Sequence, residues 1–140
     1  MSTWRRKASV LFPDLVKDLG SGESARPQFF SLLSSAAVEA HKTRDEATLR
    51  RVHGFAEWSL HQSDELWRNA AIGFYEDLFA DVPWAEIAPW LSPFVVEQVK
   101  RTWALGIGGE RAKDFDELIE GVRQPLYPTH VFSTGEVDAL

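Results

Sequence analysis

Two histidines and a glutamate recur at four-residue intervals in the middle of the chain. His53, Glu57 and His61 would lie along one face of a helix, because residues four apart on a helix are neighbours. Imidazole and carboxylate groups are ligands that zinc takes in catalytic sites. The two histidines are eight residues apart, which is about 12 Å along a helix axis, so one metal ion does not reach both. We expect histidines that bond to Glu57 or face solvent; a metal-dependent enzyme using these three residues stays open as an alternative.

Other patterns that carry chemistry are missing from the sequence. The chain has no cysteine, which excludes disulfides, thiol nucleophiles and cysteine–zinc sites. The glycines between Gly106 and Gly109 lack the spacing of a nucleotide-binding loop and are typical of a helix end. Neighbouring acids such as Glu76 and Asp77 point about 100° apart on a helix, so they do not form an acid–base pair. We expect no catalytic residue, no metal and no cofactor.

Charge is distributed unevenly along the sequence. Residues 1–53 contain nine basic and six acidic residues, whereas residues 54–97 contain one basic residue and eight acidic ones. Four of the six tryptophans also lie in this acidic middle third: Trp58, Trp67, Trp84 and Trp90. A negative field speeds association with a basic partner, and tryptophan is enriched at binding hot spots. The pattern favours an acidic surface that binds a basic protein; a solvated acidic surface over a tryptophan-rich core is the alternative.

The candidate partner-binding residues come from the acidic middle third. They are Glu57, Trp58, Glu65, Glu76, Asp81, Trp84 and Glu86. On its expected helix, Trp58 projects away from the apolar stripe. Its indole therefore either packs against another helix or the C-terminal tail, or is an exposed anchor for a partner.

Helical spacing of apolar residues recurs along the chain, whereas the two-residue alternation of strands does not persist. The expected helices begin at capping residues or prolines and end at glycine or proline. They span residues 13–19, 27–42, 45–62, 63–80, 92–105 and 111–124, with a short helical turn after residue 81. Residues 126–140 are expected to form an extended or loosely packed tail.

The segment from Ser63 to Ala80 is apolar around most of its circumference, which predicts a central helix covered by its neighbours. Arg68 falls inside the apolar arc and would need an acidic partner, and Asp77 falls beside the same arc as a partly buried acid. The length of 140 residues is typical of one domain. We predict an all-α fold, a single compact bundle of five to six helices around one central buried helix.

The sequence contains no targeting segment that we recognise and no apolar stretch of the roughly 18 residues that a membrane span needs. Its net charge of −6 argues against nucleic acid as the main partner. We expect a cytoplasmic protein that binds neither membranes nor nucleic acid. The sequence leaves the oligomeric state open.

Three stretches carry a resemblance to a family: Leu49–Trp58, Asp64–Leu78, and Trp90-Leu91-Ser92-Pro93 ahead of another helix. The pattern resembles an uncharacterised bacterial family of small all-helical proteins, similar to immunity proteins that neutralise polymorphic toxins. The resemblance implies an all-helical fold and brings no catalytic residues. Together with the acidic third, it predicts a non-catalytic protein-binding module, most concretely an immunity protein that covers a basic partner surface. A helical sensor that binds a small molecule in a tryptophan-lined pocket stays open as a further alternative.

Overall fold

The computed structural model describes residues 2–62, 64–106 and 134–140, and every regular element within them is helical. The elements in chain order are α1 (Thr3–Leu11), α2 (Pro13–Val16), α3 (Ala25–Thr43), α4 (Glu46–Leu60), α5 (Asp64–Arg68), the π-helix η1 (Asn69–Glu76), α6 (Asp77–Asp81), α7 (Trp84–Ile87), the 3-10 helix η2 (Ala88–Trp90), α8 (Pro93–Gly106) and α10 (Thr134–Asp138). The all-α prediction is confirmed. None of the described helices is long and apolar enough to cross a membrane. The helix expected over residues 111–124 lies outside the described residues.

Two helix starts follow directly from capping residues in the sequence. The side chain of Asp45 accepts a hydrogen bond from the backbone N–H of Thr48 (3.2 Å) and begins α4. The Ser92 hydroxyl accepts one from the N–H of Val95 (3.2 Å) and begins α8, with Pro93 at the first helical position. Such residues satisfy N–H groups that have no partner within the helix. Both predicted helix starts are confirmed.

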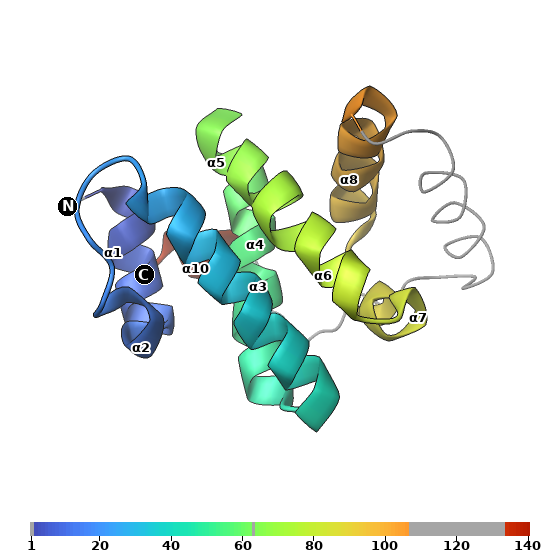
Figure 1. The fold of residues 1–140 in the computed structure, drawn as a ribbon, viewed down its shortest axis with the longest axis horizontal. Helices are drawn as coiled ribbons and strands as arrows, with labels where there is room; N and C mark the ends of the chain where they lie inside the picture. The colour runs from blue at the N-terminus through green and yellow to red at the C-terminus, as the bar shows by residue number, and fades with distance from the viewer. Residues whose placement is uncertain (1, 63, 107–133) are drawn as a thin grey trace.

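An aromatic cluster holds the first half of the bundle together. Phe29 and Phe55 are fully buried and meet edge to face, with ring centroids 5.5 Å apart. Phe12 packs edge-on against Phe55 at 5.8 Å, and Phe30 packs edge-on against Phe29 at 5.6 Å. Edge-to-face packing places the positive rim of one ring against the negative face of the next. These contacts join the α1–α2 corner to α3 and α4, and α3 crosses in front of α4 in Figure 1.

The helix predicted to be central runs without a break through α5, η1 and α6, and it contacts α3, α4 and α8. Its middle is π-helical, a geometry that closes hydrogen bonds over one more residue than an α-helix does. The wider turn rotates later side chains away from the positions that an α-helical wheel gives them. Ile72 is 47% exposed and Asp77 is exposed, although the wheel placed both in or beside the apolar arc. Arg68 is exposed as well, so the expected buried ion pair does not form.

The N-terminal and C-terminal ends of the chain lie beside each other (Figure 1). No helix was predicted before residue 13, yet α1 buries Trp4, Ala8 and Leu11 at helical spacing. Residues 134–138 of the expected tail form α10, which packs against α4, so this part is helical and not extended. The rest of the expected tail, residues 126–133, lies outside the described residues.

Candidate functional site

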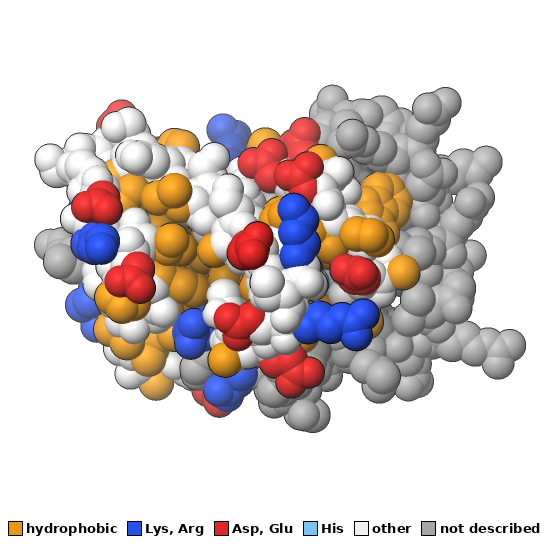
Figure 2. Space-filling view, turned by 60° about the horizontal axis from the view of Figure 1, so that its bottom comes forward, with side chains coloured by type: hydrophobic (Ala, Val, Ile, Leu, Met, Phe, Trp, Pro, Cys, Tyr) orange, Lys and Arg blue, Asp and Glu red, His pale blue; other side chains and the backbone are white. Residues whose placement is uncertain are grey.

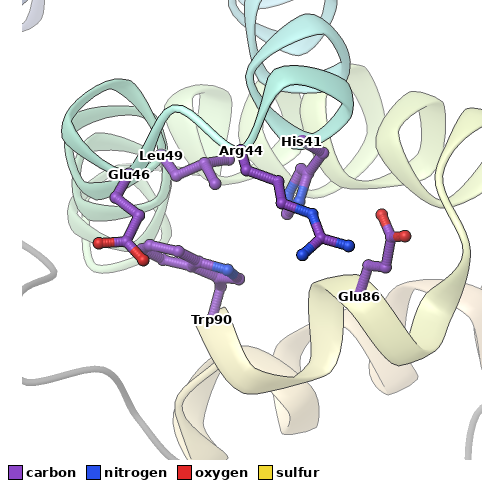
Figure 3. A pocket seen from close by; sticks show the side chains of 6 residues that line it. All are labelled: His41, Arg44, Glu46, Leu49, Glu86 and Trp90. Atoms are coloured by element: carbon purple, nitrogen blue, oxygen red, sulfur yellow. The ribbon is translucent and has the colours of Figure 1, made fainter.

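A hollow of about 200 Å³ opens where the turn between α3 and α4 faces α7 and η2 (Figure 3). Its lining residues are His41, Arg44, Glu46, Leu49, Glu86 and Trp90. We call this the Trp90 hollow. The half-buried Trp90 indole forms one wall, and the side chains of Glu46 and Glu86 are exposed on either side of the opening. The hollow therefore combines an aromatic wall with two carboxylates.

The turn that positions the hollow is only two residues long and has an unusual backbone at Arg44. Arg44 ends α3 in the left-handed conformation, with φ 55° and ψ 42°. Glycine or asparagine normally takes this place, because a larger side chain strains the backbone there. The next residue, Asp45, caps α4, and its hydrogen bonds with Thr48 lower its carboxyl pKa. The Arg44 guanidinium extends across the hollow between His41 and Glu86 (Figure 3).

A buried histidine pair lies behind the Trp90 wall. The Nε2 atoms of His41 and His53 are 3.1 Å apart, so one ring donates a hydrogen bond and the other accepts it. The His53 ring stacks on Trp90, with centroids 5.5 Å apart and planes 16° from parallel. Burial lowers the pKa of His53 well below its ordinary value, and the neighbouring His41 lowers it further. Burial also lowers the pKa of His41, an effect that Glu86 partly offsets. Both rings are therefore neutral near pH 7.

The three residues considered as metal ligands point to different partners. His53 bonds to His41, and Glu57, which is buried, accepts a hydrogen bond from the hydroxyl of Ser92. His61 is exposed and stacks on Phe94, with ring centroids 3.9 Å apart. Within residues 2–62, 64–106 and 134–140, no three His, Cys, Asp or Glu side chains form a group that could hold a metal ion. The geometry gives the metal-enzyme alternative no support.

Two of the predicted partner-binding residues lie inside the molecule. Glu57 is 6% exposed and Trp58 is 1% exposed. The Trp58 indole N–H donates to the carboxylate of Asp138 (2.7 Å), and α10 packs over α4 at this point. Both side chains are buried in this structure, and their contact with a partner stays a prediction. The packing alternative for Trp58, against the C-terminal segment, is the one observed.

The other predicted residues lie on the surface or near it, each with different neighbours. Glu65 is exposed and pairs with Arg26 at 2.7 Å, and Glu76 is half-buried. Asp81 lines a separate hollow between α3 and α6. The half-buried Trp84 donates its indole N–H to the carbonyl of Phe79 (2.9 Å). Acidic and basic side chains alternate over the face in Figure 2.

Of the predicted residues, the Trp90 hollow includes only Glu86. Sequence reasoning missed Arg44, Glu46 and Leu49 because their residue types are ordinary for a helix junction. The cap at Asp45 did locate the turn. Nothing in the sequence indicated that the turn would face Trp90, which is separated from Arg44 by the whole of α4 and the central helix.

Comparison with known proteins places the chain in one family. No curated protein and no solved structure has significant similarity to it. A family model matches residues 7–104, which is more than half of the chain and includes every residue of the Trp90 hollow. The chain belongs to the family described as a domain of unknown function, DUF7674.

Proposed function

We propose that this chain is a non-catalytic protein-binding module that receives a basic side chain of its partner in the Trp90 hollow. The observation that carries the proposal is the pair of exposed carboxylates, Glu46 and Glu86, on either side of the Trp90 indole. A lysine or arginine binds such an arrangement through charge and through its attraction to the indole face.

The charge balance of the hollow supports a cationic occupant. Glu46 and Glu86 contribute two negative charges, Arg44 contributes one positive charge, and His41 is neutral because burial lowers its pKa. One negative charge is thus left over. Arg44 also demonstrates that a guanidinium fits between Glu86 and the rest of the lining (Figure 3). The remaining negative charge gives a second cation a favourable field at the opening of the hollow.

The size of the hollow favours an anchoring side chain over a free small molecule. Pockets that enclose drug-sized ligands measure about 300–1,000 Å³, whereas the Trp90 hollow measures about 200 Å³ and is open to solvent. A single long side chain fills such a space, while the rest of its protein covers the rim. The volume of the hollow therefore favours a protein-binding module over a small-molecule sensor.

The finer form of the proposal is a cytoplasmic immunity protein that neutralises a toxin by covering a basic surface. The acidic middle third of the chain supports it, because opposite charges speed capture of a partner. The separation of His53, Glu57 and His61 supports a non-catalytic role.

The test uses the protein encoded next to this chain. The pair is co-expressed and co-purified, and growth is measured with the neighbouring protein alone and with both. We expect a complex, rescued growth, and an affinity that drops on the order of tenfold or more for Glu46→Lys combined with Glu86→Lys, because close charge pairs at interfaces are strongly coupled.

A matched control reverses two exposed acids outside the acidic middle third and outside the Trp90 hollow, Asp18→Lys combined with Glu23→Lys. The control should bind within about threefold of the unchanged chain, since rim and distant charges act weakly through screened fields. Absence of both binding and rescue removes the immunity role. Binding that the two double variants weaken equally removes the Trp90 hollow from the interface.

A further inference from the structure

The end of α10 is held by two cations of α1. Lys7 is 3% exposed, and its ammonium donates to the carbonyl oxygens of Val137 and Asp138, both at 2.8 Å. Arg6 donates to the backbone oxygen of Leu140 at 2.9 Å. The last carbonyls of a helix have no partner within the helix and carry its negative dipole end. Lys7 and Arg6 thus bind this helix end through features that any helix end presents.

Side chains add selectivity to these backbone contacts. The Trp58 indole N–H donates to Asp138 (2.7 Å), and the ammonium of Lys7 lies 5.7 Å from the centre of the same indole ring. The side chain of Val137 in the same segment is fully buried. An occupant therefore needs an apolar residue followed by an acid at the end of a short helix. We call Arg6, Lys7 and Trp58 the Lys7 site.

The Lys7 site and its occupant belong to different parts of the chain. The family match covers residues 7–104 and so includes Lys7 and Trp58, whereas residues 134–140 lie outside it. Among the described residues, Val137 is the one fully buried side chain of α10, and Glu136 and Asp138 on either side of it are exposed. A segment held by one fully buried side chain opens at lower free energy than the core does.

We infer that the Lys7 site is a second binding site, which accepts the acidic end of a short helix from a protein partner, and that residues 134–140 occupy it as a displaceable intramolecular ligand. A partner helix with the same chemistry replaces α10 and covers Trp58 in its place. The inference does not depend on the Trp90 hollow, which uses the first residues of α4, whereas Trp58 lies near the other end of that helix.

The first test measures binding of a labelled peptide of residues 134–140 to the full chain by fluorescence polarisation. Val137→Asp releases α10, because a charge cannot occupy the buried position of Val137. We expect the peptide to bind the Val137→Asp chain at least about tenfold more tightly than the unchanged chain, in which the tethered segment competes at high effective concentration.

Two matched lysine variants locate the bound peptide. Lys7→Met in the Val137→Asp chain should weaken peptide binding about tenfold or more, since it removes a charge-assisted contact to two carbonyls. Lys17→Met should leave it unchanged, because Lys17 is exposed at the end of α2, whereas the ammonium of Lys7 bonds to carbonyls of α10. Equal peptide binding to the unchanged and Val137→Asp chains, or binding to neither, would overturn the inference.

The second test needs no substitution. Hydrogen exchange of the Trp58 indole N–H is compared with that of the Val52 backbone amide in α4, each corrected for its intrinsic rate. Displacement of α10 predicts exchange at Trp58 at least about 100-fold faster, because local opening precedes global unfolding. Equal protection would mean that α10 is a permanent part of the core, and the Lys7 site would not be available to a partner.

Discussion

Trp90 and Trp58 both lie beside cations and carboxylates, but the described part of the chain fills the space beside only one of them. Around Trp90, the charged groups of Arg44, Glu46 and Glu86 surround a hollow of about 200 Å³. At Trp58, α10 packs over the indole and leaves 1% of the residue exposed. The same residue types therefore produce an open site in one place and an internal contact in the other.

The two regions differ in what lies beside the indole. The Trp58 N–H has a carboxylate partner from Asp138, and the Lys7 ammonium has carbonyl partners from the same segment. The backbone of Arg44 instead takes a strained left-handed conformation that keeps a guanidinium at an exposed turn. Strain of this kind is retained at functional sites more often than elsewhere. A complementary segment of the same chain closes the first region, and none among the described residues closes the second.

Replacing each of the two tryptophans with alanine should give the largest difference in stability loss between the two regions. Trp58→Ala should destabilise the fold by about 3–5 kcal/mol, because it leaves a large cavity and an unpartnered acid. Trp90→Ala should cost roughly 1–2 kcal/mol, because a half-buried indole loses less buried area. Urea unfolding followed by circular dichroism measures both. Equal losses would make the Trp90 wall part of the core and would end the distinction.

Acidification should act on the Trp90 region alone. Burial lowers the pKa of His53 and of His41 in the folded chain, whereas in the unfolded chain both titrate near about 6.5. The unfolded state then binds more protons as pH falls, so stability is fully present above about pH 6.5 and is lost below it. The loss should come more from His53, whose pKa burial lowers well below its ordinary value, than from His41.

The histidine source of this pH dependence is checked by urea unfolding of two variants. His53→Gln should flatten the dependence, because it removes the ring that burial shifts most. His61→Gln should leave it unchanged, because His61 is exposed. If His53→Gln leaves the change of stability with pH unaltered, groups other than His41 and His53 cause the acid sensitivity.

Removing the ammonium of Lys7, which bonds to α10, should change the stability less than the substitution of Trp58 does. Lys7→Met should destabilise the chain by about 1–2 kcal/mol, because the carbonyls of Val137 and Asp138 lose a charged donor. Lys17→Met, at an exposed position, should stay within about 0.5 kcal/mol. Chemical denaturation of the two variants compares them directly. Identical midpoints would show that α10 adds nothing to the stability of the fold.

An exposed ion pair gives a reference value for the stability changes expected in the two regions. Glu65→Gln breaks the pair with Arg26 and should change stability by no more than about 0.5 kcal/mol, since solvent screens such pairs. Thermal melting of the variant should overlap that of the unchanged chain. A larger loss would place Glu65 among the structural residues and remove it from the candidates for partner contact.

Local signals in the sequence located the starts of α4 and α8, although they missed α1 and α10. Asp45 and Ser92 cap α4 and α8 as predicted, and both act through hydrogen bonds to N–H groups three residues ahead. The π-helical turns of η1 were not predictable, because a hydrophobic wheel assumes α-helical geometry throughout. For that reason the positions of Ile72 and Asp77 were wrong, although the central position of their helix was correct.

The candidate sites depended on contacts that join distant parts of the sequence. Trp58 meets Asp138 across 80 positions, and Lys7 meets Val137 across 130. No spacing rule reaches that far, because helical periodicity relates only residues within a few turns of one another. The acidic composition of residues 54–97 suggested where to look for a partner surface. It did not show that Glu57 is buried and bonded to Ser92, whereas Glu86 is exposed at the rim of the hollow.

The amino-acid sequence by itself determined that the chain is helical, where its main helices begin, and that its acids and tryptophans gather in one third. These properties follow from periodicity, capping and composition, which are local. Only the tertiary structure decided that Trp90 faces the Arg44 turn and that α10 covers Trp58. The physical reason is that burial depends on which distant surfaces fill each other's space, and that depends on the packing of the whole chain.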